Sequence, residues 1–203
     1  MTNRREVLQG GIALTSLPIV ANVAWVAAGA SSGTNASARA LYRVVFDDRF
    51  AAARAFGAEA RRLGAAVHGI DGDITDFWYH NLDLQWRRET LAIAGMTLHG
   101  PLFCLERLAW DVGMRVVYRA EHVSARGGPS TYLIQAPQGF LPLASAQHAR
   151  ENDWARCAAR LVASCPLDTR AYPTATGVDA VSTEDNDRLI SWVIAPRARG
   201  QAA

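Results

Sequence analysis

Lysine is absent from this chain of 203 residues, and all 21 basic residues are arginine. A mechanism that forms a Schiff base on a lysine amine is therefore excluded. The chain also has no large excess of positive or negative charge, since its formal net charge at pH 7 is only +2. Since proteins that bind nucleic acid usually concentrate positive charge on one face, this balance argues against a nucleic-acid partner.

Several short motifs that carry a known chemistry are missing too. The chain has no G-x-G-x-x-G dinucleotide fingerprint, no G-x-x-x-x-G-K phosphate loop, no G-x-S-x-G nucleophile elbow and no H-E-x-x-H metalloprotease pair. Their absence leaves an enzymatic function open, but it removes the most direct argument for one. The sequence identifies neither a cofactor nor a metal.

Cysteine is scarce, with three residues and no close Cys/His spacing of the structural zinc type. Cys104 lies in an apolar helical pattern, so we expect it to be a small buried hydrophobic residue. Cys157 and Cys165 are close in sequence, and Pro166 indicates that the helix containing Cys157 ends near Cys165. A disulfide between them requires Cα atoms within about 7 Å, and two free thiols are the favoured expectation.

The N-terminus carries the most specific pattern in the chain. Residues 3–9, NRREVLQ, place two arginines after a polar residue, followed by any residue, two apolar residues and a polar residue. This order resembles a twin-arginine translocation (Tat) signal peptide. Val7 replaces the phenylalanine that the pattern favours, and Gln9 replaces the common lysine.

A moderately apolar stretch follows the arginine pair and ends in the small residues Ala-Gly-Ala at positions 28–30. We expect a signal peptidase to cleave after Ala30, with Ala38 as the second choice. The alternative is an uncleaved membrane anchor, because about 20 apolar residues can span a bilayer. The predicted organisation is a signal peptide (1–30), a linker (31–40) and one α/β domain (41–203).

The resemblance to a twin-arginine signal has implications for location and partners. It implies that the chain folds in the cytoplasm, engages the Tat translocase and reaches the periplasm in its folded state. Cells generally require this route for proteins that acquire a cofactor before export or leave bound to a larger partner protein. An uncleaved signal would instead tether the domain to the inner membrane, and this segment is the only membrane contact that the sequence suggests.

Hydrophobic periodicity from residue 41 onward alternates between strands and helices. Strands are predicted over 41–46, 65–70, 91–95 and 114–122, with helices over 50–63, over 74–86 and from Pro101 to Gly113 between them. This alternation predicts a three-layer, Rossmann-like α/β domain with a mixed, largely parallel sheet.

The second half of the chain is expected to be antiparallel. Glycines 127 and 128 separate the fourth strand from residues 131–136, which we expect to return as a hairpin. A helix over 145–163 and a final strand over 188–195 complete the prediction. Residues 165–187 form a long connection, which is either functional or conceals a further element.

The candidate site follows from the predicted topology. Ligands in open parallel sheets bind beyond the C-terminal ends of the strands, where the connecting turns meet. Several predicted strands end in turns or segments rich in glycine, carboxylates or imidazoles, so these residues are expected at one edge. The catalytic candidates are Asp71 and His99, and the ligand-binding candidates are Asp47, Asp73, Gly95, Thr97, Gly100, Arg119 and His122.

Two kinds of chemistry are open at this edge. Carboxylates such as Asp47 and Asp71, with His99 or His122, could hold a divalent metal for a small hydrolase or lyase. Alternatively, the start of the helix at Pro101 could hold an anionic group, with His99 as a proton donor and two nearby glycines allowing close approach.

Structural roles compete with these functional ones. Asp48, Asp73 and Thr97 are each placed to cap a following helix. Aspartate next to glycine, as at Asp71, is also common in turns.

Aromatic residues suggest a different function. Phe77, Trp78 and Tyr79 are consecutive, and they cannot all face one side of a helix, so Trp78 or Tyr79 should lie near the surface. Phe103 and Trp110 also fall outside the apolar stripe of their helix. We therefore favour an exported, non-catalytic protein that binds a ligand or accompanies a periplasmic redox enzyme as a small subunit, with the hydrolase or lyase as the alternative.

Overall fold

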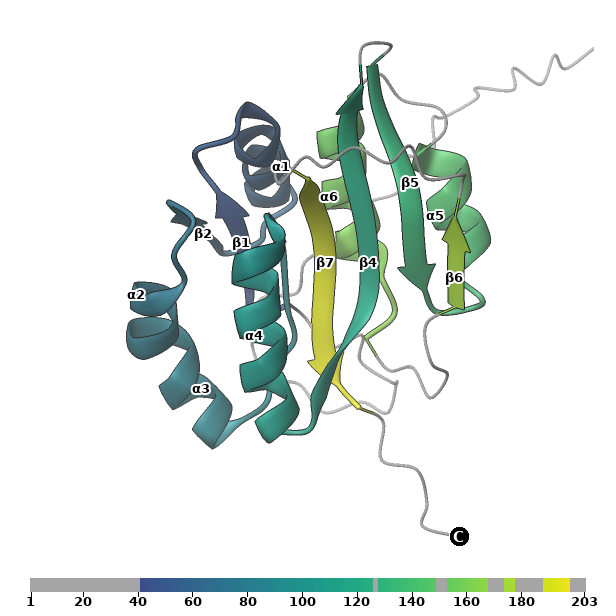
Figure 1. Ribbon diagram of the computed structural model, residues 1–203. Helices are drawn as coiled ribbons and strands as arrows, with labels where there is room; N and C mark the ends of the chain where they lie inside the picture. The colour runs from purple at the N-terminus through teal and green to yellow at the C-terminus, as the bar shows by residue number, and fades with distance from the viewer. Residues whose placement is uncertain (1–40, 126–127, 149–152, 168–173, 178–187, 198–203) are drawn as a thin grey trace, which may run out of the picture.

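The computed structural model describes residues 41–125, 128–148, 153–167, 174–177 and 188–197 (Figure 1). The predicted signal peptide and linker, residues 1–40, lie outside the described residues. Within the described ranges, no helix has both the length and the apolar character needed to cross a membrane.

Seven strands and seven helical segments make up the described part of the chain. The strands are β1 (Arg43–Asp47), β2 (Val67–Ile70), β3 (Ile93–Thr97), β4 (Met114–Ala125), β5 (Gly128–Ala136), β6 (Thr174–Gly177) and β7 (Leu189–Pro196). The helices are α1 (Ala51–Arg62), α2 (Thr75–Phe77), the π-helical turn η1 (Trp78–Leu82), α3 (Asp83–Arg88), α4 (His99–Asp111), α5 (Leu141–His148) and α6 (Trp154–Ser164).

The strands form one mixed sheet in the order β2-β1-β3-β7-β4-β5-β6. β1 pairs in parallel with β2 and with β3, and the remaining neighbours are antiparallel. Because β7 is antiparallel to both β3 and β4, the strands β1 to β4 all run in the same direction. The predicted α/β fold, with parallel strands early in the chain and antiparallel strands later, is confirmed.

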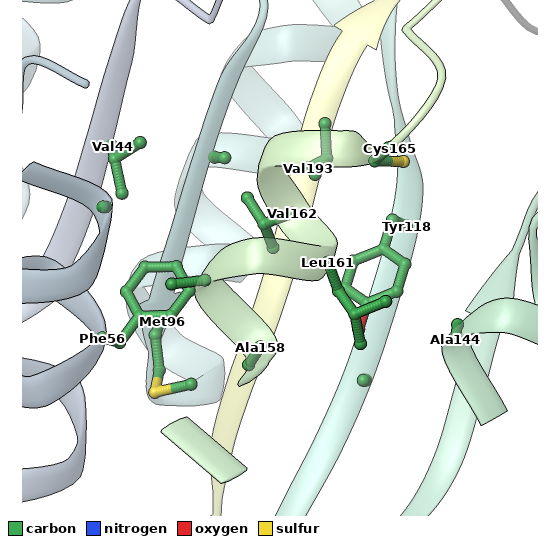
Figure 2. Packing of buried hydrophobic residues seen from close by; sticks show 14 of the residues in the cluster. Val44, Phe56, Met96, Tyr118, Ala144, Ala158, Leu161, Val162, Cys165 and Val193 are labelled. Carbon is green, nitrogen blue, oxygen red and sulfur yellow. The ribbon is translucent and has the colours of Figure 1, made fainter. Parts of the chain in front are cut away.

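Helices cover the sheet on both faces, which gives the three layers (Figure 1). α1, α5 and α6 pack behind it, where Phe56 of α1 and Leu161 of α6 are fully buried in one core (Figure 2). α2, η1, α3 and α4 lie on the opposite face, and we call them the front helical layer. Leu105 of α4 and Trp192 of β7 are fully buried in this second core.

Three details of the predicted secondary structure need correction. The single helix expected over 145–163 is two helices, α5 and α6, with residues 149–152 outside the described part. The connection over 165–187 contains β6, which adds an outer strand beside β5. The helix expected over 74–86 is present, but its middle is the π-helical turn η1.

The cysteines also differ from one expectation. Cys104 is exposed on α4 rather than buried, because it falls on the side of the helix opposite Leu102 and Leu105. Cys157 and Cys165 are buried, and neither forms a disulfide. α6 runs without interruption between them, so a rise of 1.5 Å per residue separates them by about 12 Å, beyond the reach of a disulfide. Burial raises the pKa of the Cys165 thiol to about 12.

Candidate functional site

The C-terminal ends of β1 to β4 share one edge of the sheet, as predicted. The order β2-β1-β3 makes the gap between β1 and β3 a topological switch point, because α1 leaves β1 toward the back and α4 leaves β3 toward the front (Figure 1). Ligands of open α/β sheets bind at such points. β7 separates β3 from β4, so the candidates on β4 lie two strands away from β3.

Asp47, at the end of β1, is fully buried and engaged by Arg49. The Arg49 guanidinium donates from Nε to Asp47 Oδ1 at 2.9 Å and from Nη2 to Oδ2 at 2.7 Å. The same guanidinium packs against Gly72, where a Cβ atom would overlap it and where φ is +96°. Both carboxylate oxygens of Asp47 are therefore engaged in a bidentate ion pair with Arg49, and the contact of Arg49 with Gly72 joins the turns after β1 and β2.

The two carboxylates that follow β2 differ in their surroundings. Asp73 Oδ1 accepts hydrogen bonds from the backbone N–H of Thr75 at 2.8 Å and from its hydroxyl at 2.7 Å. The hydroxyl bond is the largest cause of a lowered pKa at Asp73. These bonds organise the turn before α2, but the N-cap of α2 is Ile74 and has no side-chain cap, so the expectation that Asp73 caps this helix is wrong. Asp71 is exposed in the same turn.

Gly95 and Thr97 pack against the indole of Trp192. The indole Nε1–H donates to Thr97 Oγ1 at 3.1 Å, and the Thr97 hydroxyl donates to the backbone oxygen of Leu98 at 3.0 Å. A Cβ atom at Gly95 would overlap both the Trp192 ring and the backbone oxygen of Val45. The glycine therefore makes room for a core side chain, which is a structural reason for a glycine at this position.

α4 begins without a side-chain cap. Its N-cap residue is Leu98, so the expectation that Thr97 caps this helix is wrong. The N-cap residue of α1 is Phe50, without a side-chain cap, so the expectation that Asp48 caps α1 is wrong as well. His99 and Gly100 are exposed in the first turn of α4, and a Cβ atom at Gly100 would meet nothing within 4 Å. The His99 ring stacks on Phe103, with 6.0 Å between centroids.

The candidates on β4 point to opposite faces of the sheet. Arg119 lies beside Trp192 on the front face and donates from Nη2 to Glu121 at 2.8 Å. His122 lies on the back face, 3% exposed, with Nε2 at 2.8 Å from Ser191 Oγ. The alternation of side chains along a strand thus separates Arg119 from His122.

A buried polar cluster around His122 was not predicted. Its members are Tyr118, His122 and Ser191, and the ring of Trp154 lies 4.6 Å from that of His122. Ser191 interacts with Tyr118 as well, and burial raises the pKa of that phenol. The signal in the sequence was Ser191 itself, a lone polar residue inside the apolar run LISWVIA. We interpret the cluster as a structural contact that holds β7 against β4 beneath α6.

The predicted site residues therefore do not converge on one ligand set. Asp47, Asp73, Gly95 and Thr97 have structural partners, Arg119 is paired with Glu121, and His122 is buried on the other face. Within the described part of the chain, no group of three or more His, Cys, Asp or Glu side chains is placed to hold a metal ion. Asp71, His99 and Gly100 are the candidates that remain exposed.

The front helical layer exposes large apolar side chains. Among the described residues, five large hydrophobic side chains are exposed, and four of them belong to this layer: Tyr79 (64% exposed), Leu84 (58%), Phe103 (51%) and Trp110 (41%). The π-helical turn directs Trp78 inward, edge-on to Trp86 with ring centroids 5.9 Å apart, and leaves Tyr79 outside. The prediction that one of these two aromatics lies at the surface is confirmed.

Comparisons of this chain with protein-family models, with curated proteins and with solved structures found no match. We therefore infer function from the residues described above.

Proposed function

We propose that this chain is an exported accessory protein that binds a larger periplasmic protein through the outer surface of its front helical layer. The observation that carries the proposal is the concentration of four exposed, large apolar side chains on that layer. Large apolar side chains exposed on one face of a protein are a mark of interaction sites. Tyrosine, tryptophan and phenylalanine are also enriched where proteins bind each other.

The local structure supports a role for these side chains. π-Helical turns are rare and occur frequently at functional sites. Here the turn fixes Trp78 against Trp86, so that the neighbouring Tyr79 is held outward on a rigid support. A rigid aromatic side chain loses little conformational entropy on binding, which favours affinity.

The export signal suggests the kind of partner. A twin-arginine signal implies export in the folded state, which suits a small protein that leaves the cytoplasm bound to a larger one. We propose a cofactor-containing redox enzyme as that partner, because such enzymes must fold around their cofactor before export. The N-terminal arginine pair is the support for this part of the proposal.

The alternative function, a hydrolase or lyase that uses Asp71 and His99, has less support. General acid–base catalysis needs groups that converge on one substrate. The side chains expected to assist these two are engaged elsewhere, with Asp47 bound to Arg49 and Asp73 bound to Thr75. The binding function therefore agrees better with the geometry.

Co-purification from the original host tests the proposal. The full chain with a C-terminal tag would be recovered from the periplasmic and membrane fractions, alongside a Tyr79→Ser/Phe103→Ser variant and a Leu143→Ser control. Leu143 is 44% exposed on α5, on the opposite side of the sheet. We expect one larger protein to accompany the wild type and the control but not the double variant. Equal recovery with all three chains, or no partner with any, would contradict the proposal.

A further inference from the structure

Two arginines stack on one exposed indole at the C-terminal end of α4. The guanidinium carbon of Arg107 lies 4.2 Å from the ring centroid of Trp110, and that of Arg115 lies 5.6 Å from it. Trp110 nevertheless stays 41% exposed. Phe103 lies two turns earlier on the same helix. We call Phe103, Arg107, Trp110 and Arg115 the Trp110 cluster.

The two cations of this cluster have no carboxylate partner among the described residues. Other arginines of the described chain do, including Arg49 with Asp47 and Arg119 with Glu121. Asp111 is four residues from Arg107, a spacing that often gives an ion pair on a helix. Here Arg107 lies over Trp110, and Arg115 donates from Nη1 to the backbone oxygen of Met114 at 2.7 Å.

No described helix covers the front of β4 and β5, so α4 is the last helix of the front helical layer on that side (Figure 1). In the register with β7, Arg119 is opposite Trp192 of the front core, whereas Arg115 is opposite Ala195 of the back core, and only Arg115 reaches the Trp110 ring. A segment of another chain lying against Trp110 would therefore meet the guanidinium groups of Arg107 and Arg115 together with the aromatic rings.

The aromatic rings and the guanidinium groups of the Trp110 cluster together determine which kind of protein segment would bind there. Arginine forks bind carboxylates in a bidentate manner, and a cation–π contact strengthens when water is excluded from it. An apolar segment alone would bury both cations without counter-charge, at a large cost in desolvation. An acidic segment without apolar side chains would leave Phe103 and Trp110 in water.

We infer that the Trp110 cluster receives an acidic, apolar segment of the larger partner, whose aspartate or glutamate side chains pair with Arg107 and Arg115 while its apolar side chains cover Trp110 and Phe103. This inference rests on the proposed function and adds to it the kind of surface that the partner presents. Binding should weaken with rising salt, because both ion pairs form at a border that solvent reaches.

Charge reversal is the first test. The tagged full chain carrying Arg107→Glu and Arg115→Glu would be compared with wild type and with an Arg156→Glu control in co-purification at about 0.15 M salt. Arg156 is also exposed, but it lies on α6 behind the sheet. We expect recovery of the partner to fall at least tenfold with the double reversal and to stay unchanged with the control. Thermal unfolding of each variant separates lost binding from lost folding.

The unique exposed thiol allows a second test on the same helix. Cys104 adjoins Phe103 and is exposed, whereas the other two cysteines are buried, so a maleimide carrying a photoreactive group should label Cys104 selectively. Cross-linking in a periplasmic extract, followed by peptide sequencing, would identify what lies beside α4. We expect a partner peptide that contains both carboxylates and large apolar residues.

The outcomes separate this inference from the proposed function. If the Tyr79→Ser/Phe103→Ser variant loses the partner while the double charge reversal keeps it, the proposed function stands and the acidic segment is refuted. Cross-links to a second copy of this chain, to its own N-terminal residues, to lipid or to nucleic acid would also refute the acidic segment. If no partner is recovered with any chain, both proposals fail.

Discussion

Replacing Glu59 by glutamine should weaken the contact between α1 and α6 in a pH-dependent manner. The Glu59 carboxylate is 4% exposed and accepts two hydrogen bonds from Arg62, each 2.8 Å long. It also accepts one from Nε of Arg160 at 2.9 Å, which joins two helices 101 residues apart in sequence. The carboxylate is therefore a charged link between α1 and α6, two of the helices that cover the back of the sheet.

The magnitude follows from the pKa of Glu59. The hydrogen bond from Arg62, opposed by burial and assisted by Arg160, lowers this pKa from 4.5 to about 2. A tenfold change in a proton-binding constant corresponds to about 1.4 kcal/mol, so the upper limit is about 3 kcal/mol. Arg62 and Arg160 are 65% and 46% exposed, and water screens their charges. We therefore expect a loss of about 1–2 kcal/mol in the free energy of unfolding at pH 7.

The direction of the pH dependence follows from the same lowering of the Glu59 pKa. Because the folded pKa lies below the unfolded one, the stabilisation is complete above the unfolded value and is lost as pH falls from about 4.5 toward 2. Urea unfolding of wild type and Glu59→Gln at several pH values would show a gap at neutral pH that closes under acid conditions. Asp83→Asn, which breaks the exposed pair with Arg87, serves as a control and should cost less stability than Glu59→Gln, because water screens an exposed pair. A gap that is absent at pH 7, or that does not shrink in acid, would refute this reasoning.

Three further predictions concern the interior and the thiols. Gly95→Ala should destabilise the domain by more than about 2 kcal/mol in chemical denaturation, because the new methyl group would overlap Trp192 and the Val45 oxygen; unchanged stability would show that the sheet relaxes there. Thr97→Val should cost about 1–3 kcal/mol, since it leaves the indole N–H of Trp192 buried without an acceptor, and a stable variant would make Thr97 a binding candidate again. A thiol reagent should modify Cys104 alone in the folded protein and all three cysteines after unfolding, whereas rapid reaction of a second thiol in the folded state would contradict the burial described here.

The local elements of the fold could be predicted because their causes are local. Apolar residues at helical spacing, such as Ala53, Phe56 and Ala60, define α1, and β-branched runs define β1 and β4. The position of β7 between β3 and β4 depends on pairs such as Gly95 with Trp192, which are distant in sequence. Hydrophobic periodicity contains no information about such pairs, so the order of the strands could not be predicted from the sequence.

The candidate site was harder to predict because polar residues and glycines have several uses. Asp47 lies at the end of β1, where a metal-binding carboxylate was expected. Arg49, two residues later, neutralises its charge, and only the structure shows the two side chains in contact. Gly95 resembles a glycine that admits a ligand, while the group it admits is Trp192 from a distant strand. That Trp78 or Tyr79 lies at the surface could be predicted from the sequence, because it follows from helix geometry. That the exposed residue is Tyr79 depends on the π-helical turn and on the contact of Trp78 with Trp86, which the sequence did not predict.

Native mass spectrometry of the tagged full chain, recovered from the periplasmic and membrane fractions of its own host, tests the central claim most directly. The account predicts a complex with a larger protein for wild type and Leu143→Ser, and the chain alone for Tyr79→Ser/Phe103→Ser. A bare monomer of the wild-type chain in both fractions, or a complex that survives the loss of Tyr79 and Phe103, would contradict it.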